Sequence, residues 1–117
     1  MIKFVQGDIT KLAKDYDIVV HGCNCQNTMG SGVAKAIRDK WPEVYTADTV
    51  FSYQYLNRPY LKLGQYSEAP VPGLLIVNAY TQYDYLPRGV DHFEYASFAV
   101  ILQKLAHFYS NKDFLFP

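Results

Sequence analysis

Continuous apolar runs mark the strands that the sequence predicts. Residues 17–21 (DIVVH) form an apolar run bounded by polar residues, and residues 74–79 (LLIVNA) form a second. Such runs are typical of strands covered on both faces, as in a parallel sheet. Residues 1–6 predict a first strand, and the apolar residues 114–116 predict the beginning of a last one.

Apolar residues three and four positions apart predict the main helices. The sequence from Gly32 to Trp41 has this spacing, and Pro42 directly after it would end the helix. A longer apolar stripe predicts a helix over residues 92–110, and an aromatic-rich segment predicts a helix or helical turn over 44–56.

The pattern between these elements is weaker. Residues 9–14 are too few for more than a helical turn, and residues 58–73 contain several breakers with one short predicted strand at 61–63. A polar, aromatic loop is predicted over 81–91. The alternation of strands and helices predicts an α/β layered domain with a largely parallel sheet.

The last predicted strand stands at the end of the sequence without a helix to cover it. We therefore expect either that the chain is a fragment or that a partner chain completes its sheet. No internal repeat, linker or low-complexity tract interrupts the sequence.

Composition and charge exclude several classes of protein. The 117 residues suffice for one domain, and with 50% hydrophobic and 19% charged residues the chain should fold. Eleven basic and eleven acidic residues give a formal net charge of +0, so we expect no long nucleic acid as a partner. No apolar stretch is long enough to span a membrane and the N-terminus lacks a secretory signal, so we expect a cytoplasmic protein without a membrane partner.

The two cysteines suggest no metal centre. Cys23 and Cys25 flank one residue, which disfavours a disulfide between them. Together with His21 they could share one face of a strand, but nothing nearby supplies a second pair of zinc ligands. We expect small buried thiols, no metal and no cofactor.

The segment HGCNCQNTMGSGVA, residues 21–34, carries the candidate chemistry. Gly30, Ser31 and Gly32 follow a predicted strand and precede a predicted helix, where backbone N–H groups favour anions such as a pyrophosphate. The pattern is neither a Walker loop nor the GxGxxG dinucleotide fingerprint. Taken alone, it fits a structural turn as well as an anion site.

The longer string IVVHGCNCQNTMGSGVAKAI resembles the first ligand loop of macro domains, the ADP-ribose-binding modules. The opening FVQGDIT resembles the second signature of that family, and the order of the two motifs agrees. The histidine and cysteines of the loop are closest to the branch that includes ADP-ribose 1''-phosphate phosphatases. The resemblance implies a single three-layer α/β/α domain over residues 1–117 with a mixed, largely parallel central sheet, whose C-terminal part is missing.

The resemblance also implies a function. The chain would bind ADP-ribose or a derivative and remove the terminal phosphate of ADP-ribose 1''-phosphate without a cofactor. Alternatives are a non-catalytic ADP-ribose reader and a hydrolase of ADP-ribosylated proteins, in which case the partner would be an ADP-ribosylated protein.

Binding roles can be carried over from the family to matching residues. Asp8 would accept from the adenine amino group beside the backbone N–H of Ile9, although the residues alone favour a cap at Asp8. Asn24 would bind the distal ribose, or else satisfy backbone groups of its own turn. The remaining positions would line that turn or bind the pyrophosphate through main-chain N–H groups: Asn27, Thr28, Gly30, Ser31, Gly32 and Val33.

His21 matches a histidine that the phosphatase branch uses to remove the terminal phosphate. An imidazole with an ordinary pKa near ~6.5 can act as an acid or a base at neutral pH. The alternative is a strand-end histidine bonded to a neighbouring carbonyl. His92 and His107 are expected to be structural.

The sequence also departs from the family. In the family, a strand and a second glycine loop, which often carries an aspartate as catalytic partner, follow the point where this sequence ends. If the 117 residues are the whole protein, we expect weakened binding and a phosphatase site without its second half. The lysine of the branch that reverses protein ADP-ribosylation is absent from this sequence. The usual adenine-stacking aromatic lies late in the chain, and Tyr80, Tyr83 and Tyr85 are its candidate substitutes.

Overall fold

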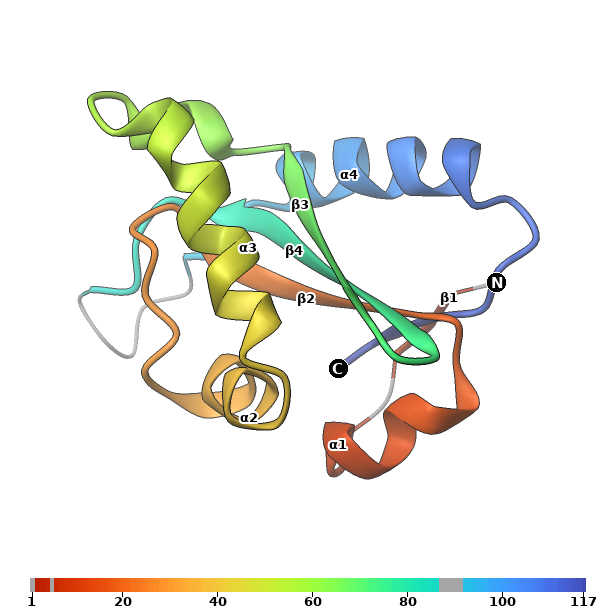
Figure 1. Cartoon of the computed structure of the whole chain (residues 1–117). Helices are drawn as coiled ribbons and strands as arrows, with labels where there is room; N and C mark the ends of the chain where they lie inside the picture. Colours follow the sequence, from red (N-terminus) through yellow and green to blue (C-terminus); the bar gives the residue numbers. More distant parts are fainter. Residues whose placement is uncertain (1, 5, 87–91) are drawn as a thin grey trace.

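The computed structural model describes residues 2–4, 6–86 and 92–117 as an α/β domain (Figure 1). Its strands and α-helices follow in the order β1 (Ile2–Phe4), α1 (Ile9–Leu12), β2 (Ile18–Asn24), α2 (Gly32–Lys40), α3 (Glu43–Ser52), β3 (Tyr66–Val71), β4 (Leu74–Gln82), α4 (Tyr95–Phe108) and β5 (Phe114–Phe116). Short 3-10 helices occur at η1 (Ala13–Asp15), η2 (Tyr53–Tyr55) and η3 (Pro59–Lys62).

The sheet is mixed and largely parallel, as predicted. Its strands lie in the order β1-β5-β2-β4-β3. The pairs β1–β5, β5–β2 and β2–β4 are parallel, and the edge strand β3 pairs antiparallel with β4. The central strand β2 is therefore flanked by parallel neighbours, and its carboxyl end lies at the same edge of the sheet as that of β4.

Two hydrophobic layers cover the faces of the sheet, which confirms the predicted three-layer arrangement. Val19 and Cys23 of β2 point into a core formed with α1, α2 and α3. Ile18 and Val20, at the alternate positions, point into a second core formed with Ile101 and Leu105 of α4. Figure 1 shows α4 on one side of the sheet and α2 on the other.

Most of the predicted helices and strands are present, but the prediction of a strand at 61–63 is wrong. Residues 61–63 do not form a strand, because Pro59 begins η3 and fills the first position of a helical turn, where its missing N–H costs nothing. The strand in this region is β3, which the sequence analysis did not predict.

The predicted loop over 81–91 is shorter than expected, since β4 continues through Thr81 and Gln82. Residues 87–91 of that loop lie outside the described residues. Within the described ranges, the model contains no helix with the length and apolar character needed to cross a membrane.

Candidate functional site

The loop that joins β2 to α2 lies at the carboxyl end of the central strand. Gly32 begins α2 with a φ of 61°, a backbone conformation that glycine adopts without strain. Ser31, the N-cap residue, makes no side-chain hydrogen bond to the first turn. The first N–H groups of a helix have no partner within the helix, so this end of α2 presents uncapped donors.

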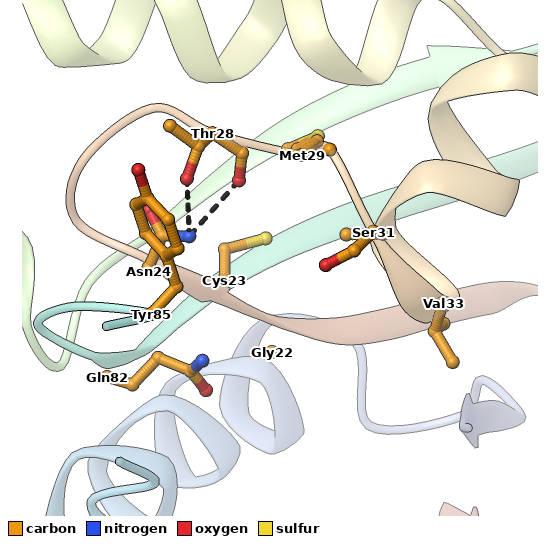
Figure 2. Close-up of a pocket in the computed structure, with 11 residues that line it drawn as sticks. Gly22, Cys23, Asn24, Thr28, Met29, Ser31, Val33, Gln82 and Tyr85 are labelled. Carbon is orange, nitrogen blue, oxygen red and sulfur yellow. Dashed lines mark hydrogen bonds between the residues drawn. The ribbon is translucent and has the colours of Figure 1, made fainter. Parts of the chain in front are cut away.

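A pocket of about 460 Å³ opens beside this loop (Figure 2). Its walls come from the end of β2, from the loop with the first turn of α2, and from the segment at the end of β4. The lining residues are Gly22, Cys23, Asn24, Thr28, Met29, Gly30, Ser31, Val33, Ala34, Gln82 and Tyr85.

The structure brings together about half of the residues that the sequence predicted for the site. Asn24, Gly30, Ser31 and Val33 line the pocket, together with Thr28. The others do not line it: Asp8, Ile9, His21, Asn27 and Gly32.

Asn24 serves the turn while it lines the pocket. Its Nδ2 donates to the carbonyl oxygen of Thr28 at 3.1 Å and to the Thr28 hydroxyl at 2.9 Å (Figure 2). Its Oδ1 accepts from the backbone N–H of Gln26 at 2.8 Å. The side chain thus closes the loop on itself, which is the alternative that the sequence left open.

Asn27 belongs to the loop but turns toward α3. Its backbone has a φ of 58°, unusual for a residue with a side chain. The Tyr45 hydroxyl donates to its carbonyl oxygen at 3.1 Å, and the Thr49 hydroxyl donates to its Oδ1 at 3.2 Å. Both oxygens of Asn27, the backbone carbonyl and Oδ1, therefore fix the loop on α3.

Asp8 and Ile9 occupy structural positions outside the pocket. Asp8 is the N-cap of α1, and its Oδ1 accepts from the Thr10 N–H at 3.0 Å and from the Thr10 hydroxyl at 2.6 Å. These bonds, the hydroxyl first, lower the pKa of the Asp8 carboxyl below its usual value. Ile9 is buried in the core on the α1 side of the sheet.

His21 lies inside the fold rather than on the pocket wall. Only 2% of it is exposed, and its Nε2 is 2.6 Å from Oδ1 of Asn78. Because Nδ2 of Asn78 donates to the carbonyl oxygen of Val44 at 3.0 Å, Oδ1 must accept, and the proton lies on Nε2 of His21. Burial lowers the pKa of His21 from 6.5 to about 4, which keeps the ring neutral at pH 7. This placement favours the structural alternative for His21.

Several pocket residues were not predicted. Gly22 has no room for a side chain, because a Cβ there would lie 2.7 Å from Oγ1 of Thr81. Gln82 reaches the pocket from the end of β4, the parallel neighbour of β2. Of the three candidate tyrosines, Tyr85 lines the pocket, whereas Tyr80 is fully buried in the core.

Both cysteines, at the end of β2 and just after it, are free thiols buried in the fold. Burial raises the pKa of Cys23 well above its usual range and that of Cys25 to about 11. In the part of the chain that the structure describes, no group of three or more histidine, cysteine or acidic residues is arranged to hold a metal ion.

Comparisons with known proteins agree with this architecture. A macrodomain protein from Streptomyces coelicolor superposes with a TM-score of 0.76 at 21% identity, over 100% of this chain and 78% of that one. The macrodomain of Mycobacterium tuberculosis DarG gives a TM-score of 0.70 at 21% identity, over 98% and 74%. The chain therefore has the fold of a macro domain, with its pocket beside the glycine loop.

Sequence comparison supports the same class and gives the family. No family model matches the chain. An uncharacterized 17.5 kDa protein of phage T4 is 33% identical over 116 residues, which cover 96% of this chain and 70% of the phage protein. The chain belongs to the same family as that phage protein.

Fungal proteins named ADP-ribose 1''-phosphate phosphatase are further relatives. The one from Candida albicans is 26% identical over 112 residues, covering 92% of this chain and 70% of the fungal protein. The one from Neosartorya fischeri is 42% identical over 55 residues, or 47% of this chain, and the match spans only 27% of the fungal protein.

Proposed function

We propose that the pocket binds ADP-ribose or a derivative of it, with the diphosphate at the uncapped end of α2. The observation that carries the proposal is the exposed glycine loop, whose Gly30, Ser31 and Val33 form one wall of the pocket. Uncapped N–H groups and the dipole of a helix together favour a phosphate. A volume of about 460 Å³ lies within the usual range for a small-molecule site. The names of the fungal relatives support the same ligand class.

The other walls suit the uncharged parts of such a ligand. The amide of Gln82 can donate to and accept from a ribose diol. The partly exposed ring of Tyr85 offers a flat face for stacking. Asn24 donates both N–H groups of its amide to Thr28, so it supplies shape rather than free donors.

For the reaction, we propose removal of the terminal phosphate from ADP-ribose 1''-phosphate. His21 is neutral and faces the core, so in this proposal it acts as a positioning residue through Cys23, whose Sγ lies 3.6 Å from Nε2 of the ring. The turnover rate is then expected to show no inflection near the ordinary histidine pKa of about 6.5.

A second candidate is a non-catalytic ADP-ribose reader. It is favoured by the lining of the pocket, in which the described residues include no carboxylate, lysine, arginine or histidine to activate water. Phosphate release separates the two candidates. Turnover by the wild type supports the phosphatase, whereas binding of ADP-ribose without any turnover supports the reader.

The binding proposal is tested by calorimetric titration with ADP-ribose. Gly30 lacks a positive φ and a Cβ there meets nothing within 4 Å, so Gly30→Glu and Gly30→Gln should fold normally. Gly30→Glu should weaken binding at least about tenfold, because it places a carboxylate beside the diphosphate. Gly30→Gln, of the same size but neutral, should lose less. Equal affinity of Gly30→Glu and the wild type would exclude this binding mode.

A further inference from the structure

A lysine is completely buried behind the pocket loop. Lys62, at the end of η3, has 0% of its surface exposed. Its Nζ lies 2.6 Å from Oγ of Ser52 and 3.2 Å from the carbonyl oxygen of Cys25, and it donates to both. A third partner is Oδ1 of Asp48, 3.6 Å away, which is equally buried. The ammonium group thus donates two hydrogen bonds and forms one buried ion pair.

A charge in this place is an expensive way to fill a core. Removing an ammonium and a carboxylate from water costs more than burying apolar side chains of the same volume, and such pairs often add no stability. Packing therefore does not explain why a lysine is buried at position 62. Outside α3 and η3, the ammonium lies 4.6 Å from the centroid of the Tyr80 ring in the core and donates to the carbonyl of Cys25 in the pocket loop.

Cys25 lies at the base of the pocket wall. It directly follows Asn24 and stands three residues before Thr28, and both of these line the pocket. The N–H of Cys25 donates to the carbonyl oxygen of Tyr83 at 3.0 Å, and its own carbonyl accepts from Lys62. Both backbone groups of this residue are therefore fixed, one on each side of the loop.

One face of α3 supports the arrangement. Asp48 and Ser52, one turn apart, hold the ammonium of Lys62, while Tyr45 and Thr49 on the same face donate to Asn27. The first half of the loop is thus attached to α3 directly and also through Lys62.

Close packing between the loop and α3 is incomplete. A cavity of about 240 Å³ lies between them, lined by Cys25, Gln26, Asn27, Ser52, Tyr55, Leu56, Pro59 and Lys62. Since part of the loop faces a cavity rather than close-packed side chains, its position depends on hydrogen bonds, and the bond from Lys62 to Cys25 is one of them.

We propose that Lys62 is a positioning residue of the ligand pocket. Through Cys25 it holds the wall formed by Asn24 and Thr28 in the binding conformation before the ligand arrives. Preorganisation of this kind raises affinity, because the cost of ordering the wall is met in folding rather than in binding. The expected effect on ligand affinity rests on the proposed function of the pocket. The ordering of the loop by Lys62 does not depend on that function.

The test removes the ammonium without leaving a buried charge. In Lys62→Met/Asp48→Asn both charges are gone, and Oδ1 of the asparagine can still accept from the Tyr80 hydroxyl, which lies 2.6 Å from Asp48. The matched control is Lys104→Met. Lys104 also donates to a backbone carbonyl, that of Gly64 at 3.2 Å, but that segment does not line the pocket.

Two measurements are made on each protein at matched global stability. Hydrogen exchange at the amides of Cys25 and Gln26 in the free protein should be at least about tenfold faster in the double variant and unchanged in Lys104→Met. The dissociation constant for ADP-ribose should rise about fivefold or more in the double variant only.

Each outcome decides one claim. Unchanged exchange at the amides of Cys25 and Gln26 would overturn the positioning role. If the wild type binds ADP-ribose, an unchanged dissociation constant in the double variant would overturn it as well. Absence of binding by the wild type would overturn the proposed function, and the exchange rates would then decide the positioning role. If the double variant does not fold, Ser52→Ala replaces it. That variant removes one partner of the ammonium and should shift both readouts in the same direction by about twofold.

Discussion

The two halves of the loop between β2 and α2 differ in how they are held. The first half, residues 24–28, is bonded to itself, to α3, to Lys62 and to Tyr83. The second half, residues 30–33, is exposed, and no side chain caps the helix that it begins. The first half has its hydrogen bonds satisfied within the protein, whereas the second presents donors outward.

This difference assigns different tasks to neighbouring residues. A wall whose polar groups are already paired can fix the shape of a ligand but has little left to donate. A glycine-rich helix end has few side chains to give shape, yet it supplies the N–H groups that an anion needs. Mutations in the two halves should therefore fail in different ways: the first in stability and order, the second in binding.

The largest effect on stability is expected when Lys62, which supports the first half of the loop, loses the carboxylate of Asp48. Asp48→Ala leaves the ammonium of Lys62 buried and unpaired, and should lower the free energy of unfolding by about 3–5 kcal/mol. Chemical denaturation at pH 7 measures this loss.

The control for Asp48 is the exposed pair of Lys35 and Asp39. Its atoms are closer, at 2.6 Å, but the two side chains are 57% and 60% exposed. Asp39→Ala should therefore cost less than about 1 kcal/mol. Similar losses for Asp48→Ala and Asp39→Ala would mean that the buried pair gives the first half no special support.

The second largest effect is a dependence of stability on pH, and it comes from His21, which is buried near the first half of the loop. The pKa of His21 falls from 6.5 in the unfolded chain to about 4 in the fold. Between these values the unfolded chain binds the proton more readily, so stability is complete above pH 6.5 and decreases toward pH 4. The loss from this group should reach about 3 kcal/mol, measured by denaturation at pH 7, 5.5 and 4.

Carboxylates also titrate in this range, so the comparison is made with His21→Gln. The amide of that variant can still donate to Asn78 but does not titrate. Its stability should decrease less between pH 7 and pH 4 than that of the wild type. Parallel curves for the two proteins would refute the assignment of the pH dependence to His21.

The smallest effect separates two glycines of the second half. Gly32 has a φ of 61°, so Gly32→Ala should cost about 1 kcal/mol through backbone strain. Gly30 has no such φ and a Cβ there meets open space, so Gly30→Ala should change stability by less than about 0.5 kcal/mol. Thermal denaturation of both variants measures the difference, and equal melting temperatures would contradict it.

The sequence predicted the central part of the fold because burial there leaves a clear pattern. Apolar runs identified β2, β4 and β5, and three- and four-residue spacing identified α2 and α4. It failed at β3, whose buried positions are held by Ser67, Ala69 and Val71 rather than by large apolar residues. Pro70 also argued against a strand, yet β3 is an edge strand, where a missing N–H is tolerated.

The part of the site that lies on one continuous segment was predicted. The part that depends on the pairing of strands distant in the sequence was missed. The loop after β2 was recognised from its own residues. Tyr85 was named only as one of three candidate tyrosines. Gln82 could have been found as well, because the carboxyl ends of neighbouring parallel strands meet at one edge of a sheet. Lys62 and Asp48 could not, since charged residues are rarely buried and only the tertiary structure shows that they are.

The pocket wall, as far as the chain is described, has no ionised side chain, and this affects how fast a ligand arrives as well as how it is held. Without an ionised side chain in the described wall, electrostatic steering of an anion into the pocket should be weak and should raise the association rate little. Amide dipoles act only at short range, so ionic strength should change that rate little. The affinity of such a pocket for its ligand would be set by the dissociation rate rather than by the association rate.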